Sequence, residues 1–411
     1  MLKTTIDILF WLFFLYCVFS VSYLFLLAVC GNLFYRRKIG DIRHVPVTQK
    51  IAILVPGYKE DGIIVSSAAQ LLLQQYPRQL FDIFIIADSF QPSTLQRLRE
   101  LDVHVLEVVF EKSTKLKSLD EAFSRIHGQY DIALICDSDN VLGQNVLLQL
   151  NACFVQGSKA IQAQRVAKNL DTPFAILDGC SEAINNHIFR KGANALGLSS
   201  SIIGSGMAFS FPVIKQVIQE INTAGSVIVH EDKILQLKII EQGINIHYLE
   251  GALVFDEKVD SPQAFKQQRK RWVLGQFLYL KQFFLPAMGQ LFKGNISYFN
   301  IAVLHNLVLP RAFMFVILLV LIPVSFLMNF SIGILATLLW MAYLLTMFLS
   351  LPRGLINKEL LNALLRLPRA ILLMVATLFR MKKANDTFIH TVHTRTEVSN
   401  KYLTKTPDKK G

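Results

Sequence analysis

The sequence predicts an α/β domain with a doubly wound parallel sheet, set between segments that cross or lie on a membrane. Three observations lead to this prediction. Hydrophobic residues make up 52% of the 411 residues and charged residues only 18%, whereas a soluble domain carries about a quarter. Short apolar runs alternate with helical patterns between residues 50 and 260. The formal net charge of +12 lies wholly near the two ends of the chain.

The excess positive charge lies beside the longest apolar runs. Residues 1–50 hold six basic and two acidic side chains, and residues 353–411 hold twelve and four, so residues 51–352 carry no net charge. A nucleic-acid-binding domain would carry its excess on a folded face. Basic residues that flank apolar runs are instead typical of the cytosolic side of membrane proteins. We therefore expect membrane lipids, and no nucleic acid, among the partners.

The first apolar run is long enough to cross the hydrocarbon core of a bilayer. It covers residues 6–30, contains one charged residue, Asp7, and precedes a basic cluster at residues 36–38. Because basic residues stay on the cytosolic side, residues 1–35 are predicted to be a transmembrane anchor whose C-terminal end is cytosolic.

Two further runs cover residues 299–328 and 331–351. The joint at Asn329 lacks Lys and Arg and is expected outside, so two transmembrane helices are predicted over residues 299–351. Arg311 lies inside the first of them. It either faces protein, where it could mark a path for a polar substrate, or reaches the cytosolic interface. The chain is thus predicted to be an integral, multi-pass protein of the cell (inner) membrane with a cytosolic central domain.

The C-terminal part is basic. Residues 353–383 predict an amphipathic interfacial helix broken at Pro368, with a fourth span through residues 371–379 as the alternative. Residues 384–411 are predicted to form a basic cytosolic tail. The five cysteines show no Cys-x-x-Cys spacing, which argues against a zinc site and favours reduced thiols.

Within the central domain, residues 50–260, four short apolar runs are predicted strands: 51–55, 82–87, 103–109 and 130–136. Helical patterns separate them. Continuous apolar strands joined by helices are typical of a parallel sheet covered on both faces. In such sheets, ligands bind beyond the carboxyl ends of the strands.

Polar and acidic residues follow the ends of these strands: Pro56, Tyr58, Glu60, Asp88, Asp137 and Asp139. Asp137 and Asp139 come directly after a buried strand with one residue between them. Carboxylate oxygens are ligands of Mg²⁺ or Mn²⁺, which often bind substrate phosphates as well. The alternative is a polar turn at the end of the strand.

Two motifs lie downstream. Residues 230–232, His-Glu-Asp, open a predicted helix, where carboxylates are favoured by the helix dipole and often only cap the helix. Gln268, Arg271 and Trp272 lie in the segment QQRKRW. Arginine matches phosphate oxygens, and tryptophan offers a flat face to a sugar ring. An amphipathic helix at the membrane surface, over residues 261–298, is the compatible alternative.

In their order along the chain, these motifs resemble those of membrane-integrated family 2 glycosyltransferases. That group includes the cellulose, chitin, hyaluronan and poly-N-acetylglucosamine synthases. The resemblance covers about residues 50 to 280 and rests on VPGYKE from Val55, Asp88, KSLDEAF from Lys117, DSD at 137–139, GSGMAF at 204–209, HED at 230–232 and the QxxRW motif ending at Trp272. The chain departs from the family pattern at Ala87, often Asp, and at His230, usually Thr.

The resemblance implies a GT-A (Rossmann-like) fold and inverting transfer from a nucleotide-sugar donor, most often a UDP-sugar. By position it implies that the following residues bind the nucleotide-sugar: Pro56, Tyr58, Glu60, Asp88, Lys117, Asp137, Gln268 and Arg271. Asp139, with Asp137, would bind Mg²⁺ or Mn²⁺, and Asp232 would be the general base. The acceptor would contact Gly204, Ser205, Gly206, Glu231 and Trp272.

Three functional hypotheses remain. The first is extension of a polysaccharide at the membrane, and the second is transfer of one sugar to a lipid acceptor, giving a glycolipid. A catalytically inactive scaffold is the third, and the complete set of carboxylates argues against it. Three spans are few for an export pore, so export would require a homodimer, a fourth span or an export partner.

Overall fold

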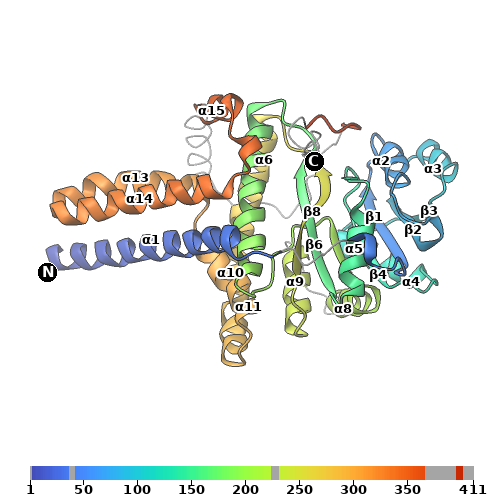
Figure 1. Ribbon diagram of the computed structural model, residues 1–411, viewed down its shortest axis with the longest axis horizontal. Coiled ribbons are helices and arrows are strands. Elements are labelled where there is room, and N and C mark those ends of the chain that lie inside the picture. The colour runs from blue at the N-terminus through green and yellow to red at the C-terminus, as the bar shows by residue number, and fades with distance from the viewer. Residues whose placement is uncertain (1, 37–41, 224–230, 366–394, 401–411) are drawn as a thin grey trace. The chain divides into compact units, whose positions relative to one another are not determined.

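The computed structural model describes residues 2–36, 42–223, 231–365 and 395–400 (Figure 1). The chain forms two compact units. The first, which we call the helical unit, comprises Met1–Tyr35, Ala183–Leu198 and Lys266–Lys382. The second, the sheet unit, comprises Arg36–Glu182, Ser199–Phe265 and Lys383–Gly411. Each unit is described by itself.

The sheet unit is built on an eight-stranded sheet of order β3-β2-β1-β4-β7-β6-β8-β5. The strands are β1 Ile51–Tyr58, β2 Phe81–Asp88, β3 His104–Val108, β4 Ile132–Ile135, β5 Val141–Leu142, β6 Ala160–Ala167, β7 Met207–Ser210 and β8 His247–Asp256. The first four are parallel, as the sequence predicts. The rest of the sheet is mixed, because β7 runs antiparallel to both β4 and β6, and β5 runs antiparallel to β8.

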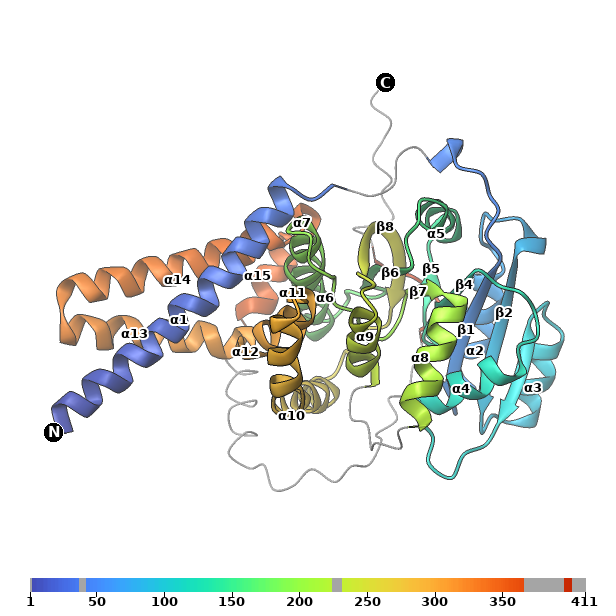
Figure 2. The same ribbon diagram turned by 90° about the horizontal axis from the view of Figure 1, so that it is seen from below.

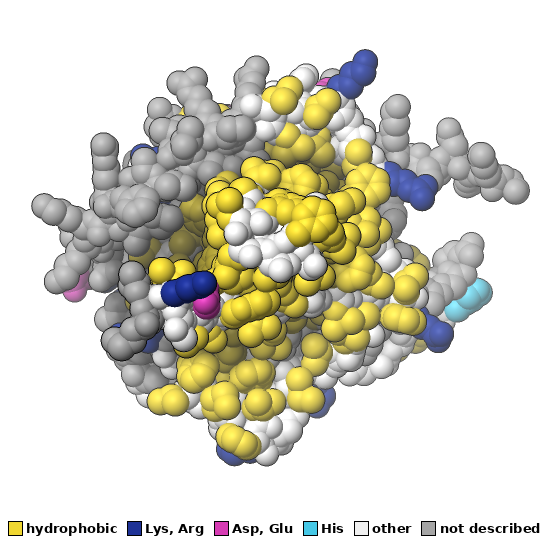
Figure 3. Space-filling view, turned by 90° about the vertical axis from the view of Figure 1, so that its left-hand side faces the viewer, with side chains coloured by type: hydrophobic (Ala, Val, Ile, Leu, Met, Phe, Trp, Pro, Cys, Tyr) yellow, Lys and Arg dark blue, Asp and Glu magenta, His cyan; other side chains and the backbone are white. Residues whose placement is uncertain are grey.

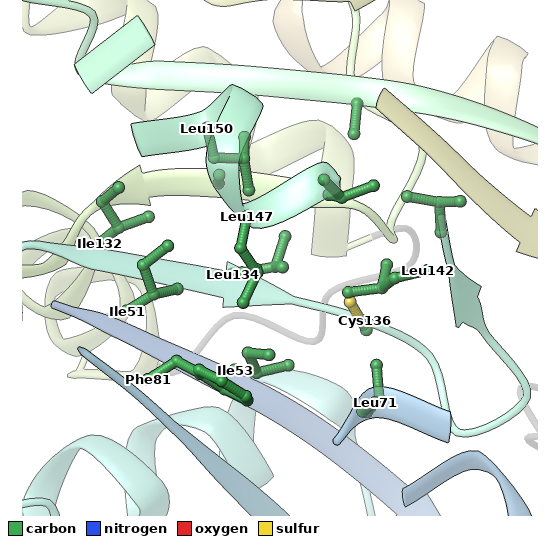
Figure 4. Close-up of a cluster of buried hydrophobic side chains, with 14 of the residues drawn as sticks. Ile51, Ile53, Leu71, Phe81, Ile132, Leu134, Cys136, Leu142, Leu147 and Leu150 are labelled. Atoms are coloured by element: carbon green, nitrogen blue, oxygen red, sulfur yellow. The ribbon is translucent and has the colours of Figure 1, made fainter. Parts of the chain in front are cut away.

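The central strands are apolar along their length because helices cover both faces of the sheet. Alternate residues of β1, such as Ile51 and Ile53, pack with Leu147 and Leu150 of α5, Val146–Val155, and with Leu71 of α2, Ile64–Leu71 (Figure 4). On the other face, α4, Lys115–Arg125, packs beside α8, Phe211–Thr223 (Figure 2). Since successive strand residues point to opposite faces, this arrangement buries both sets.

Three further helices complete the sheet unit: α3 Pro92–Arg99, α6 Pro173–Asn185 and α9 Glu231–Glu241. At its C-terminal end, α6 enters the helical unit and continues into a π-helical segment, Asn186–Gly192. Part of the predicted tail, residues 395–400, packs on the sheet unit, where Arg395 pairs with Asp171 at 2.7 Å and Asn400 donates to the Ala167 carbonyl at 2.7 Å.

The helical unit contains α1 Leu2–Leu33, α7 Ala193–Ala195, α10 Pro262–Phe292, which begins in the sheet unit, α11 Ile296–Phe299, α12 His305–Leu307, α13 Arg311–Met328, α14 Phe330–Ser350 and α15 Lys358–Leu365. Among the described residues, three helices are long and apolar enough to cross a membrane: Lys3–Leu33, Arg311–Met328 and Phe330–Ser350. Figure 3 shows the face that lies on the left-hand side of Figure 1, where most of the described side chains are hydrophobic.

The second predicted span begins later than expected, at Arg311 rather than at residue 299. The preceding helix α12 ends at Leu307, and the chain is extended at Val308. Pro310 lies directly before α13, and because it lacks an N–H group and disfavours helical geometry at Leu309, it keeps the two helices from joining. Arg311 faces protein, donating to Asn185 Oδ1 at 2.6 Å. The joint at Asn329 is observed as predicted. The predicted interfacial helix or fourth span lies mostly outside the described residues.

All five cysteines are buried and free, in agreement with the expectation of reduced thiols.

Candidate active site

Three carboxylates meet beyond the ends of β4 and β8. Asp137 and Asp139 follow β4, and Asp256 is the last residue of β8. One oxygen from each residue lies within 4.8 Å of the corresponding oxygens of the other two. We call these residues the acidic triad. Asp256 was not among the sequence candidates, although the mostly apolar run 248–255 that precedes it is a strand signal of the same kind.

Asn140 holds the triad together. Its Oδ1 accepts from the backbone N–H of Asp137 at 3.0 Å, and its Nδ2 donates to Asp139 at 3.2 Å and to Asp256 Oδ1 at 3.3 Å. The backbone N–H of Glu257 donates to the other oxygen of Asp139 at 2.8 Å. One amide therefore links the loop after β4 to the end of β8.

The triad fits a hard divalent cation. Its ligand atoms are all carboxylate oxygens, the donor type that Mg²⁺ and Mn²⁺ take. Asp139 is buried, whereas the Asp137 side chain is 36% exposed. A cation and a substrate phosphate could therefore reach the triad from the side of Asp137.

A lysine connects the triad to a glycine-containing loop. Lys115 Nζ forms an ion pair with Asp137 Oδ1 and donates to the Gly204 carbonyl at 2.8 Å. The sequence expectation named Lys117, but its ammonium group bonds the carbonyl of Lys112 on the surface. The structure thus brings Lys115, two residues earlier, to the site.

The loop before β7 requires glycine at two positions. Gly204 has φ +84° and Gly206 has φ +62°, a region that side chains with a Cβ rarely adopt. A Cβ on Gly206 would lie 2.9 Å from Cγ2 of Val254, and one on Gly204 would lie 3.9 Å from Oδ2 of Asp232. Gly204 therefore lies between Lys115 on one side and Asp232 on the other.

Asp232 and Glu231 lie in the first turn of α9, as predicted. Glu231 accepts from the backbone N–H of Leu116 in α4 at 2.9 Å. Burial raises the pKa of Glu231, while the bonds from Leu116 and Thr114 and the charge of Lys115 act in the opposite direction. Glu231 thus ties the start of α9 to the start of α4, which carries Lys115. His230 lies outside the described residues.

A second polar region lies at the ends of β1 and β2. Asp88 is the register partner of Tyr58 and is 1% exposed. Ser89 Oγ donates to one of its oxygens at 2.9 Å, but Asp88 Oδ2 is buried and accepts no hydrogen bond from any described residue. Both Lys59 and Ser89 have positive φ, 54° and 59°. Such backbone geometry often marks ligand sites.

The other candidates are placed as follows. Pro56 lies in β1 beside β2, and Glu60 is buried just after β1. Ser205 is buried, and its hydroxyl forms no hydrogen bond with any described residue. Gln268, Arg271 and Trp272 lie in α10, within the helical unit. There the Arg269 guanidinium lies 4.7 Å from the centre of the Trp272 ring, and Arg271 is exposed.

The mixed sheet with its acidic triad at the strand ends defines a GT-A type glycosyltransferase. The profile described as "Glycosyltransferase like family 2" matches residues 48–275, more than half of the chain. The chain therefore belongs to glycosyltransferase family 2 and is an enzyme.

Individual relatives are distant. The chain is 22% identical over 334 residues to the probable glycosyltransferase YdaM of Bacillus subtilis (strain 168), covering 75% of this chain and 76% of that protein. Its structure is similar to the mannosyltransferase PcManGT from Pyrobaculum calidifontis in complex with GDP-Man and Mn²⁺, with a TM-score of 0.48, 14% identity, and coverage of 85% and 98%. It is also similar to a glucosyl-3-phosphoglycerate synthase from Mycobacterium tuberculosis, with a TM-score of 0.34, 13% identity, and coverage of 52% and 72%.

Proposed function

We propose that this glycosyltransferase moves a sugar from a UDP-sugar to a growing polysaccharide at the membrane, with inversion at the anomeric carbon. The observation that carries the proposal is the continuous path from the acidic triad to Asp232. Lys115 links Asp137 to Gly204, and Gly204 lies against Asp232. A site for a diphosphate leaving group and a candidate base therefore lie close together in one unit.

The base role follows from where Asp232 lies. It is placed beside Gly204, where a Cβ would come no closer than 3.9 Å to Oδ2 of Asp232, so that the absence of a side chain there leaves room for a sugar. An ionised carboxylate at this point accepts the proton of the acceptor hydroxyl as that oxygen attacks the sugar. Attack from the side opposite the diphosphate inverts the anomeric centre.

The donor end is assigned to the triad and to Asp88. Asp137, Asp139 and Asp256 would hold Mg²⁺ or Mn²⁺, which supplies charge neutralisation for the departing diphosphate. Asp88 Oδ2, which accepts no hydrogen bond within the described part of the chain, suits a hydrogen-bond donor on the nucleoside. Gln268 and Arg271 would contact the diphosphate and Trp272 the acceptor, as the QxxRW resemblance implies.

A lipid acceptor is the second candidate. The described part of the chain has three helices able to cross a membrane, which are few to enclose a pore for a polymer. Transfer of a single sugar to a lipid needs no such pore. Processive export would instead require a second copy of the chain or a partner.

The experiment uses the full chain purified in detergent or nanodiscs. We expect UDP release from one member of a panel of UDP-sugars, with GDP-mannose as a competing donor, and loss of release after chelation of divalent cations. Asp232→Asn should abolish release, while Asp260→Asn, at an exposed aspartate of the same unit that pairs with Arg395, should not. Full activity of Asp232→Asn would contradict the base assignment. Product length distinguishes the two acceptors: a ladder of products supports the growing polysaccharide, and one glycolipid supports the lipid acceptor.

A further inference from the structure

A cluster of buried ions lies directly behind the acidic triad. It consists of Arg165 from β6, Glu182 from α6, Asp256 at the end of β8, and Lys258 two residues after it. The strands β6 and β8 lie side by side (Figure 1). Lys258 is 3% exposed, Glu182 5% and Asp256 9%. Burying four charged groups is unfavourable unless they are paired and hydrogen-bonded.

The pairing in this cluster is complete and specific. Lys258 Nζ forms an ion pair with Glu182 and donates to Asp256 Oδ2 at 2.7 Å. Arg165 Nε donates to the other oxygen of Glu182 at 2.6 Å, and its Nη1 lies 3.4 Å from Asp256 Oδ1. Two cations and two anions therefore form a neutral group, of which only Asp256 belongs to the triad.

The two oxygens of Asp256 have different surroundings. Oδ2 is held by Lys258 at 2.7 Å, away from the triad. Oδ1 has the longer contacts, and one of these is with Nδ2 of Asn140. The same nitrogen also donates to Asp139. The short bond fixes the carboxylate on one side and directs its other oxygen toward Asp139.

The backbone of Lys258 is fixed as well. The side-chain amide of Asn169 accepts from the Lys258 N–H at 2.7 Å and donates to its carbonyl at 3.1 Å. Lys168, on the same loop, donates from Nζ to the carbonyl of Asp139 at 2.7 Å. Lys258 is thus anchored at both ends, by Asn169 and by Glu182.

We propose that Lys258, held by Glu182, which also pairs with Arg165, is a positioning residue that orients Asp256 as the third ligand of the divalent cation. It acts through Asp256 and does not itself touch the cation or the substrate. The inference rests on the proposed function only in taking the triad as a cation site. Groups behind a metal ligand typically change metal affinity by about 10- to 100-fold when they are removed.

The test measures Mn²⁺ binding to the full chain without donor or acceptor, from the electron paramagnetic resonance signal of free Mn²⁺. The charge-balanced double variant Glu182→Gln, Lys258→Met is expected to raise the Kd for Mn²⁺ by about 10-fold or more. Adding Asp256→Asn to it should have little further effect, because the ligand is already misplaced. As a control, Tyr76→Phe removes the hydroxyl that bonds the Gln49 carbonyl and Asn151 Oδ1 in the same unit and should leave Kd unchanged.

An unchanged Kd in a double variant that unfolds cooperatively would overturn the inference, and so would equal weakening by Tyr76→Phe. If the double variant fails to fold, the single variant Lys258→Arg tests the positioning role instead. It keeps the positive charge but replaces the compact ammonium group with a planar guanidinium group, which cannot make the same contacts. Several-fold weaker Mn²⁺ binding supports positioning, and unchanged binding refutes it.

UDP release measured in parallel separates this inference from the proposed function. A wild-type protein that binds Mn²⁺ as expected but releases no UDP contradicts the proposed function alone. If the wild-type protein releases UDP but the double variant binds Mn²⁺ with the same affinity as wild type, the result contradicts the positioning role and leaves the proposed function intact.

Discussion

Replacing Lys115 by Met distinguishes it from its neighbour Lys117, because only Lys115 reaches the triad. Lys115 Nζ contacts both Asp137 and the Gly204 carbonyl, whereas Lys117 Nζ donates to the Lys112 carbonyl at 3.1 Å. Both residues lie in α4, so Lys117→Met is a matched control for helix propensity and surface charge. The sequence expectation names Lys117 as the donor-binding residue, whereas the contacts in the structure lead us to predict that Lys115 matters more for activity.

The expected magnitudes differ for stability and for activity. The side chains of Lys115 and Asp137 are 28% and 36% exposed, and a partly solvated ion pair contributes at most about 1 kcal/mol to folding. Loss of one hydrogen bond to a charged group at the reacting diphosphate costs about 1.5 to 3 kcal/mol, or about 10- to 100-fold in rate. Lys115→Met should therefore lower kcat/KM by about 10- to 100-fold while the melting temperature hardly changes.

The assay is steady-state UDP release at saturating divalent cation, with thermal unfolding of each variant measured by intrinsic fluorescence. Lys117→Met should lower kcat/KM by less than about twofold, because its contact is exposed and remote from the triad. Equal losses in the two variants, or a larger loss in Lys117→Met, would refute the reasoning from the Lys115 contacts.

Three other predictions concern single residues. In denaturant titrations, Gly206→Ala should lower the free energy of unfolding by more than Gly157→Ala does. Both substitutions cost roughly 1–3 kcal/mol in backbone strain at a positive φ. The added Cβ would also clash with Val254 at residue 206, whereas at residue 157 it would enter open space. Asp88→Ala should raise KM for the nucleotide-sugar by about 10-fold or more, because it removes the buried oxygen Oδ2, which accepts no hydrogen bond from any described residue; an unchanged KM would contradict the nucleoside role. Burial alone would raise the pKa of Asp82, but Tyr130, Lys50 and His104 hold it below its usual value, so its contribution is present above the ordinary pKa and is lost as the pH falls through the folded value. Asp82→Asn should thus be less stable than wild type at neutral pH and equal to it in strong acid, and a constant difference across that range would contradict this.

The sequence predicted the first half of the fold well. The strands at residues 51–55, 82–87, 103–109 and 130–136 are observed as β1 to β4. β1, β2 and β4 are largely apolar runs buried on both faces, whereas β3 is exposed at His104 and Glu107. The second half was not predicted. β5 and β7 are two and four residues long, too short for any periodic pattern, and the direction of β7 depends on the turn that Gly204 and Gly206 permit.

The site shows the same division. Asp88, Asp137 and Asp139 could be found because each directly follows a predicted strand. Asp256 also follows a strand signal, but its place in the triad depends on the pairing between β6 and β8, which is not local in sequence. The hydrogen bond of Asn140 to Asp256 likewise joins residues 116 positions apart. The sequence expectation named Lys117 instead of Lys115, because the orientation of α4 decides which of the two side chains points to Asp137 and the sequence does not show that orientation.

By itself, the sequence determined the local properties of this protein: which segments are apolar enough to cross a membrane, which runs form the parallel strands, and which carboxylates follow them. These depend on hydrophobicity and on neighbours along the chain. Only the tertiary structure decided which distant groups meet, bringing Asp256 to Asp137 and Asp139, Lys115 to Asp137, and Lys258 with Glu182 behind Asp256. Such contacts arise from strand order and helix orientation, which are set by packing of the whole unit rather than by any short stretch of residues.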